Sequence, residues 1–430
     1  MFDPLIAWDR LLLLCAPAFT QPSFTLFQCL MTAWALCPGR KTVTAMISMI
    51  EPVKRRAHDA YHRLLRSAQW SLAKLWCPLT LWLIARFAKD GQIPLLLDDT
   101  LYHKCGRRVS GAGVFRDAVR STAKHVVYAR GLNLVVLCVR VTPPWTGEPL
   151  ALPINVRLHH KGGPTLLDLA EEMVREVAGW LPERTFKLCC DGAYASLAGR
   201  GLDRTVVLSR MRRDAALFRR PVPPRKRRAG RPRKKGARLP LLEKIAKTTK
   251  GWKKCTIDCR GRSKELKLLA LPVLWYGVCP DSEVLLVIVR DPSGKQPDDF
   301  FFTTDLQETP ALVAADYASR WAIEDTFRNA KQYLGGQHPQ TWKGEGPERA
   351  AGLSFWLYVA IWAWYLLVHG DRQTWEPTPW YPAKRAAAFQ DALAALRRVL
   401  WRKRFSSLNV FGPQMRKTVT SLINALARAG

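Results

Sequence analysis

Apolar residues recur at the spacing of an α-helix through the first part of the chain, up to about residue 88. This periodicity is present in the segments FDPLIAWDRLLLLCA, FTLFQCLMTAWALC and RLLRSAQWSLAKLW. Prolines such as Pro17, Pro38 and Pro78 stand between or within these segments and are typical of helix boundaries. The pattern therefore predicts a helical N-terminal domain over residues 1–90.

Beyond residue 90 the pattern changes to short aliphatic runs typical of β-strands. The runs IPLLLDDT, GLNLVVLCVRVT and EPLALPINVRL predict three strands, helical periodicity follows over 164–180, and TFKLCCDG and RTVVLSRM predict two further strands with a helix between them. Acidic residues end the first and the fourth run. This order predicts an α/β domain, and such domains place their active sites at strand ends.

Composition divides the rest of the chain. Residues 219–250 hold 14 Lys or Arg and one acidic residue, and strand-like runs follow. We therefore predict that the α/β domain has a first part over 91–214, a basic loop with a β-rich insertion over 215–295, and a second part over 296–370 that includes a helix at about 309–334. Residues 371–430 show two basic helical patterns, which leave contact with DNA and packing against a partner subunit both open.

One apolar run, LSFWLYVAIWAWYLLV at 353–368, is nearly long enough to cross a membrane. It has about 16 residues, whereas a spanning helix needs about 20. The chain has no second candidate segment and a high net charge. We therefore predict a helix buried in the protein core, and we expect no membrane partner.

The charge balance indicates which class of molecule the chain binds. The chain has 67 Lys and Arg against 35 Asp and Glu, a formal charge of +32. This excess favours a polyanion, with nucleic acid first, and basic clusters such as Lys54–Arg56 then favour DNA contact by the N-terminal domain. Hydrophobic residues make up 48% of the chain, which indicates a folded protein. The odd number of 11 cysteines favours reduced thiols and a cytoplasmic location, associated with the nucleoid.

The most informative motif lies in DYASRWAIEDTFRNAKQYLGG and reads Y-x2-R-x3-E-x6-K. Its members are Tyr317, Arg320, Glu324 and Lys331. On one continuous helix these side chains and that of Arg328 would fall within an arc of roughly 80°. Cations around a single carboxylate suit a phosphate backbone whose reacting group is held by a metal. The alternative is a solvated helix face with salt bridges.

Three carboxylates provide candidate metal ligands. Asp99, or its neighbour Asp98, ends the first predicted strand, Asp191 ends the fourth, and Glu324 lies on the later helix. Hard oxygen ligands suit Mg²⁺ or Mn²⁺, and two such ions in one site catalyse phosphodiester cleavage without a protein nucleophile. We therefore expect two divalent ions in each active site.

These motifs together resemble the DDE transposases of bacterial insertion sequences, in the branch that bears the Tyr-Arg-Glu-Lys signature. The matching segments are LLLDDT, CCDGAY and the spaced quartet. The resemblance implies an RNase H-like catalytic core interrupted by a mostly β insertion, with helical N-terminal and C-terminal regions. It also implies cut-and-paste transposition between inverted terminal repeats. Its Asp-Thr pattern favours Asp99 over Asp98 as the first metal ligand.

The resemblance also implies roles for the other residues of the quartet. Tyr317, Arg320 and Lys331 would contact phosphates near the cleaved end, which relatives hold as a hairpin, and Trp321 would stack on a flipped base or serve as a core residue. The further candidates for DNA contact are Arg328, Arg213, Arg231 and Lys104. A homodimer on double-stranded DNA is expected, because a transposon has two ends. The alternative function is a non-catalytic DNA-binding protein derived from a transposase.

Overall fold

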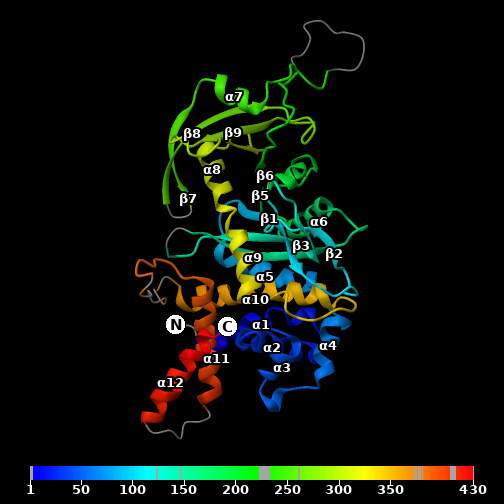
Figure 1. Cartoon of the computed structure of the whole chain (residues 1–430), viewed down its shortest axis with the longest axis vertical. Coiled ribbons are helices and arrows are strands. Elements are labelled where there is room, and N and C mark those ends of the chain that lie inside the picture. Colours follow the sequence, from blue (N-terminus) through cyan, green and yellow to red (C-terminus); the bar gives the residue numbers. More distant parts are fainter. Residues whose placement is uncertain are drawn as a thin grey trace.

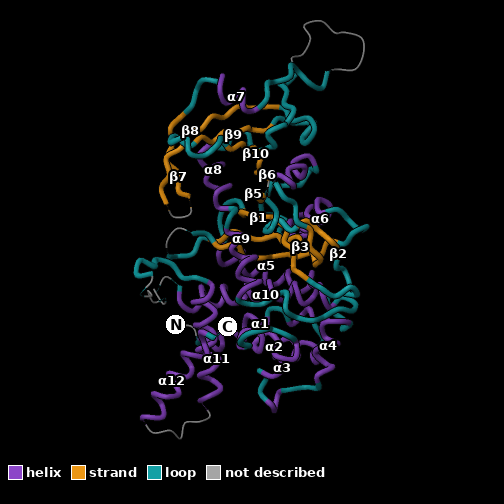
Figure 2. Tube along the Cα trace, in the orientation of Figure 1, coloured by secondary structure: helices purple, strands orange, loops and turns teal. Residues whose placement is uncertain are grey.

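The computed structural model describes residues 3–122, 124–145, 148–221, 233–259, 262–370, 372, 375, 379, 381–406 and 413–429. Along its long axis the β insertion lies at one end, the main sheet in the middle, and the N-terminal and C-terminal helices at the other end (Figure 1). Figure 2 shows that strands are confined to the first two of these layers.

The N-terminal region is helical, as its periodicity predicts. It comprises α1 (Pro4–Leu13), η1 (Ala16–Ala18), α2 (Gln21–Leu36), α3 (Val43–Ser48), η2 (Pro52–Lys54), α4 (His58–Arg66) and α5 (Leu72–Phe87). Side chains at the helix starts accept hydrogen bonds from the first free backbone N–H groups: Asp3 does so for α1, Thr42 for α3 and Ser71 for α5. The prolines at the first turns of α1 and α2 need no such partner for their own nitrogen.

A ten-stranded sheet extends from the middle of the molecule into the insertion. Its strands are β1 (Ile93–His103), β2 (Gly113–Arg116), β3 (Tyr128–Val141), β4 (Leu150–His159), β5 (Phe186–Cys190), β6 (Thr205–Arg210), β7 (Lys253–Cys259), β8 (Arg262–Val273), β9 (Val284–Arg290) and β10 (Asp299–Thr303). Their order is β2-β3-β1-β5-β6-β10-β9-β8-β7, with β4 also paired to β3. The central strands β1, β5 and β6 are parallel, and β1 pairs antiparallel with β3.

The segments before and after β5 confirm the predicted alternation of strands and helices, with one difference. Helix α6 (Leu166–Trp180) begins at Thr165, whose side chain forms a capping box with Asp168. The segment between β5 and β6, however, is the 3₁₀ helix η3 (Gly192–Gly199) and not an α-helix. This short connection places residues just after Asp191 against the sheet.

The first strand does not end at its acidic residues, contrary to the sequence-based expectation. Strand β1 continues to His103 because its pairing with β3 persists as far as His103 and Gly131. Its pairing with the parallel strand β5 stops at Leu97 and Cys190. The acidic pair after Leu97 therefore lies in the middle of β1, at the level where β5 ends.

The β-rich insertion extends the main sheet and is not a separate sheet. Strand β10 pairs with β6 on one side and with β9 on the other, so β9, β8 and β7 continue the same sheet outward. The short helix α7 (Leu242–Thr248) packs into a second core with residues of β8, β9 and β10. Helix α8 (Pro310–Ser319) then lies against this extended part of the sheet (Figure 1).

The apolar run at 353–368 forms the middle of α10 (Gly346–His369), which is buried almost throughout. By length and composition this helix is the one candidate membrane span among the described residues, but 94% of its most apolar window is buried inside the protein. It contacts strand β4 and helices α1, α4 and α5. The prediction of a buried core helix is therefore confirmed.

Two further helices form the C-terminal region, as the sequence predicts. They are α11 (Phe389–Ser406) and α12 (Pro413–Arg428), which pack against each other as a hairpin. Helix α11 also contacts α2 and α10, so the hairpin is attached to the helical end of the molecule. In Figure 1 it extends away from the sheet.

Candidate active site

The site begins with the two acidic positions on adjacent parallel strands. Leu97 of β1 is paired with Cys190 of β5, so the next residues, Asp98 and Asp191, lie side by side where β5 ends. Neighbouring residues at one level of a parallel sheet project from the same face, whereas consecutive residues project from opposite faces. Asp98 and Asp191 therefore share a face of the sheet, and Asp99 belongs to the other face.

Arg320 connects Asp98 to Glu324. Its guanidinium donates hydrogen bonds to Oδ2 of Asp98 at 2.6 Å and to Oε1 of Glu324 at 3.2 Å. Glu324 lies in the first turn of α9 (Ala322–Gln332), and Arg320 precedes that helix. The structure thus brings together Asp98, Asp191 and Glu324 on one face, around a buried cation.

Asp99 has a different environment. Its Oδ1 accepts a hydrogen bond from the hydroxyl of Tyr194 at 2.9 Å, and Asn133 of β3 is a second hydrogen-bond partner. Burial raises the pKa of Asp99, and these two partners oppose the shift. Sequence motifs favoured Asp99 as the first metal ligand, but the contacts of Arg320 favour Asp98.

The signature motif does not lie on one continuous helix. Helix α8 ends at Ser319 and α9 begins at Ala322, with a tight turn at Arg320 and Trp321. Both turn residues keep right-handed helical dihedral angles, but the amides of Ile323 and Glu324 bond to the carbonyls three residues back instead of four. The predicted single stripe of charge is therefore divided between two helices, and the turn places Arg320 over the carboxylates.

Tyr317, at the end of α8, lies on the same face of the sheet as the carboxylates. Its ring stacks on Phe301 of β10 with centroids 4.1 Å apart, and its hydroxyl donates to Oδ1 of Asp191 at 3.4 Å. Burial raises the pKa of Tyr317, so the phenol stays protonated and can act as a donor. The guanidinium of Arg320 lies 5.6 Å from the centre of the Tyr317 ring.

The positive charge of Arg320 does not fully balance the buried carboxylates on this face. Burial, together with the neighbouring carboxylates of Asp99 and Asp191, raises the pKa of Asp98 to about 7 despite the opposing effect of Arg320. Burial also raises the pKa of Glu324. Carboxylates in this state favour an added cation, and an all-oxygen donor set fits Mg²⁺ or Mn²⁺. Among the described residues, no three acidic, His or Cys side chains stand close enough to hold a metal as they are placed, because Arg320 lies between Asp98 and Glu324.

The remaining residues of the signature helix differ in exposure. Trp321 is 47% exposed at the start of α9, which suits contact with a ligand better than a role in the core. The side chain of Arg328 is 58% exposed and pairs with Asp325 at 2.8 Å. Lys331 points back toward β1, where its ammonium lies 5.9 Å from the centre of the Tyr102 ring, and burial lowers its pKa.

Two of the other three candidates for DNA contact, Lys104 and Arg213, lie apart from this face. Lys104 donates to the backbone carbonyls of Gln337 and Pro339, each at 2.8 Å, so its ammonium holds a loop of the protein. Arg213 bonds to Glu243 at 3.2 Å on the insertion. Arg231 lies outside the described residues.

The burial of Lys104 has a measurable consequence. Burial lowers its pKa to about 8, so between pH 8 and its ordinary value near 10.5 the unfolded chain binds a proton that the folded chain does not. This group therefore adds stability as the pH rises through that window. We expect the free energy of unfolding of Lys104→Met, relative to wild type, to fall between pH 7.5 and 10 by on the order of 1–3 kcal/mol. Denaturation in urea at both pH values measures this difference, and an equal response in the two proteins would contradict the burial.

A buried ion network, which the sequence patterns above did not predict, lies beneath the site. Asp316, the residue before Tyr317, accepts hydrogen bonds from Arg140 of β3 at 2.6 Å and Lys187 of β5 at 2.5 Å. Lys187 also contacts Glu308. An acidic residue at a buried helix position was the available signal, because apolar residues surround it on α8. The network joins α8 to both strands and so fixes the position of Tyr317.

Comparison with known families identifies the family of the chain. A family model described as "DDE superfamily endonuclease" matches residues 16–266, more than half of the chain. The chain belongs to this family.

For this DDE superfamily endonuclease, the matched range contains Asp98, Asp99 and Asp191 but ends before Glu324. A search of curated proteins finds no match. Among solved structures, a cryo-EM structure of a piggyBac transposase synaptic complex with hairpin DNA is similar, with 11% identity and a TM-score of 0.41 over 99% of this chain and 85% of that chain.

Proposed function

We propose that this DDE superfamily endonuclease is a DNA transposase, which binds terminal inverted repeats, cleaves double-stranded DNA at the ends and joins them to a target. The observation that carries the proposal is the convergence of Asp98, Asp191 and Glu324 around Arg320. An acidic cluster with oxygen donors suits phosphoryl transfer assisted by divalent ions.

The topology supports an RNase H-like core. Strands β4, β3, β1, β5 and β6 are adjacent in that order, the first three antiparallel and the last three parallel. Strands β7 to β9 enter between β6 and α8, so the insertion separates the first two carboxylates from Glu324 in sequence. We infer that the β insertion leaves this core intact because it joins the sheet at the outer edge of β6 through β10.

We propose Asp98, Asp191 and Glu324 as the ligands of the divalent ions. Bound Mg²⁺ or Mn²⁺ would polarise the scissile phosphate and activate the attacking oxygen. Arg320 would then exchange its contacts with the two carboxylates for contacts with phosphate. Its Nε is buried and has no hydrogen-bond partner among the described residues, which supports a further acceptor such as a phosphate oxygen at this position.

The neighbouring side chains supply positioning. The Tyr317 hydroxyl orients the carboxylate of Asp191, and its ring is held by the stack on Phe301. Trp321 and Arg328, which are both exposed, would contact DNA beside the cleaved bond, the first by stacking and the second by pairing with phosphate. Two transposon ends require two such sites, so we propose a homodimer on DNA.

An endonuclease assay tests the proposal. A labelled duplex carrying the DNA that flanks the gene is incubated with wild type or Glu324→Gln, with Mg²⁺, with Mn²⁺ or with EDTA. We expect cleavage by wild type with either ion, none with EDTA, and a loss of roughly 10³-fold or more in Glu324→Gln with DNA binding retained. Metal-dependent cutting by Glu324→Gln at the wild-type rate would contradict the assignment. Binding without any cutting by wild type would instead support the non-catalytic alternative.

A further inference from the structure

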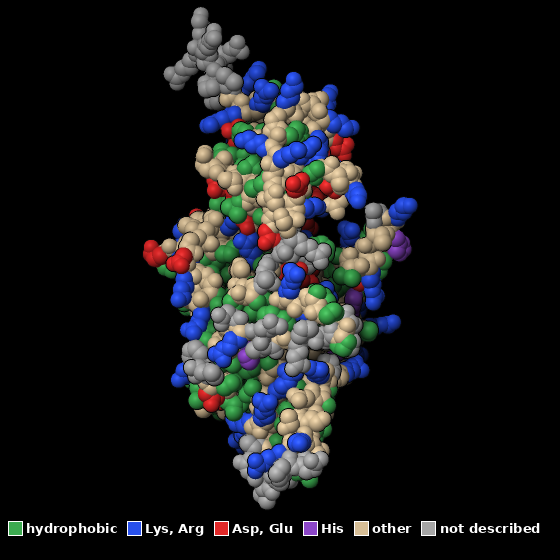
Figure 3. Space-filling model, turned by 90° about the vertical axis from the view of Figure 1, so that its left-hand side faces the viewer, with side chains coloured by type: hydrophobic (Ala, Val, Ile, Leu, Met, Phe, Trp, Pro, Cys, Tyr) green, Lys and Arg blue, Asp and Glu red, His purple; other side chains and the backbone are tan. Residues whose placement is uncertain are grey.

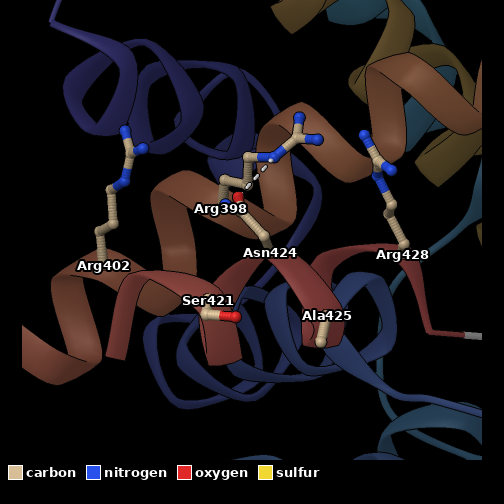
Figure 4. A pocket seen from close by; sticks show the side chains of 6 residues that line it. All are labelled: Arg398, Arg402, Ser421, Asn424, Ala425 and Arg428. Carbon is tan, nitrogen blue, oxygen red and sulfur yellow. Dashed lines mark hydrogen bonds between the residues drawn. The ribbon is translucent and has the colours of Figure 1, made fainter. Parts of the chain in front are cut away.

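A groove lined by arginines lies between the two C-terminal helices. Its volume is about 640 Å³. It is lined by Arg398 and Arg402 of α11 and by Ser421, Asn424, Ala425 and Arg428 of α12. The three guanidinium groups project to the same side of the hairpin, and none of the six lining residues is acidic (Figure 4).

The walls of the groove are held in place by specific contacts. Nε of Arg398 donates to Oδ1 of Asn424 at 3.2 Å, which joins the two helices across the groove. Ile423 and Ala427 on the opposite face of α12 are buried at 4% and 1% exposure. Polar residues thus face the groove and apolar residues face the protein, so the hairpin is an ordered support for the arginines.

Arg397 fixes the base of the same hairpin. It is 2% exposed and donates to the carbonyls of Ala35 at 2.7 Å and Ala429 at 2.6 Å, which lie at the carboxyl ends of α2 and α12. A cation at two helix carboxyl ends is favoured by both helix dipoles. Burial lowers the pKa of Arg397 to about 10, so it stays charged at neutral pH. The side chain next to Arg398 thereby sets the position of α11 against α12.

The sequence around the groove carries an excess of basic residues. From residue 392 to residue 430 the chain has eight Lys or Arg and no Asp or Glu. Figure 3 shows Lys and Arg side chains over the C-terminal helices at the lower end of the molecule as well as over the insertion. Guanidinium groups pair with phosphate through parallel hydrogen bonds, which makes a phosphodiester the favoured anion for three arginines in one groove.

The groove is separate from the carboxylate face. Helix α10 lies between the sheet and the N-terminal helices, and the hairpin is attached on the far side of α10 from β1 and β5 (Figure 1). Phosphates in the groove would therefore belong to a stretch of DNA away from the bond being cut. Such a contact adds affinity without adding to the chemistry.

We propose that the groove between α11 and α12 is a second binding site for the phosphate backbone of double-stranded DNA. The choice of DNA as the polyanion rests on the proposed function. Arg402 and Arg428 supply the outer pair of charges from the two helices, and Arg398, held by Asn424, supplies the charge at the junction. The site binds DNA without sequence preference, because its ligands are phosphates.

Matched charge changes in the full-length chain test the proposal. Arg402→Ala/Arg428→Ala removes two cations from the groove, and Arg416→Ala/Lys417→Ala removes two from exposed positions of α12 outside it. Fluorescence anisotropy with a labelled duplex of arbitrary sequence is measured over a range of salt concentrations. We expect the groove variant to bind roughly ten-fold more weakly and to lower the slope of log K against log salt by about 2, with little change in the control.

Other outcomes overturn the proposal in distinguishable ways. Equal weakening of both variants would mean that only net charge matters. A change of oligomeric state in the groove variant alone, measured by light scattering without DNA, would mean that the groove binds another copy of the chain. Unchanged affinity with an unchanged melting temperature would exclude the site. If wild type itself binds no DNA, the proposed function is wrong, whatever the groove does. Glu324→Gln serves as a control, because normal DNA binding by this variant shows that the binding assay does not depend on catalysis.

Discussion

Asp98→Asn is expected to abolish metal-dependent cleavage, with a loss of roughly 10³-fold or more, whereas Asp99→Asn should stay within about ten-fold of wild type. The two residues are adjacent on β1 but project from opposite faces of the sheet. Asp98 bonds to Arg320 at 2.6 Å and lies beside Asp191 at the end of β5. Asp99 bonds to Tyr194 on the other face.

The chemistry of the two substitutions makes them a matched pair. Asparagine has nearly the volume of aspartate but carries no charge, so at position 98 it removes the negative charge of a proposed metal ligand and the ion pair with Arg320. At position 99 it keeps an oxygen that can accept from the Tyr194 hydroxyl, so the local contact survives.

Cleavage rates of both variants at saturating DNA, with binding measured in parallel, test this expectation. Loss of cleavage in Asp99→Asn, with activity kept in Asp98→Asn, would reverse the assignment and restore the choice that the Asp-Thr motif favoured. Thermal melting of each variant separates this outcome from a failure to fold.

The choice between these two residues illustrates what local patterns leave open. The run IPLLLDDT predicts a strand, but both faces of a central strand are buried, so the sequence contains no alternation that says which acid faces which layer. The answer depends on the pairing of Leu97 with Cys190, almost a hundred residues away. Helices α5 and α6, in contrast, were predictable because their apolar periodicity is a property of each segment alone, and α10 was predictable from its continuous apolar run.

The roles of Lys104 and Arg320 were obscured for related reasons. Lys104 looks like an exposed cation in sequence, but the loop after α9 covers it and supplies two carbonyl acceptors. Arg320 looks like one member of a continuous helical stripe, yet it lies in a turn whose residues keep helical dihedral angles. Neither the loop packing nor the altered hydrogen bonding of the turn changes the hydrophobic pattern from which the elements were predicted.

Asp316→Ala is expected to lower the free energy of unfolding by roughly 3–5 kcal/mol, because it breaks a buried ion network. The side chain of Asp316 is 8% exposed and accepts from Arg140 and Lys187, which come from two different strands. Without it, Lys187 keeps Glu308 as a partner, but Arg140 loses the carboxylate that compensates its charge. Chemical denaturation measures the loss, and Asp316→Asn separates the effect of charge from that of volume.

An exposed pair in the same chain provides the control. Arg212 and Asp214 are paired at 2.8 Å with side chains 70% and 68% exposed, so Asp214→Ala should leave stability nearly unchanged.

The buried network also affects the active site, since Asp316 precedes Tyr317 and anchors α8 to β3 and β5. We therefore expect Asp316→Asn to weaken cleavage more than DNA binding, because a displaced α8 moves Tyr317 and Arg320 away from the carboxylates. Equal destabilisation by Asp214→Ala and Asp316→Ala would show that the buried network stabilises the fold no more than an exposed ion pair does. In that case the network would not anchor α8.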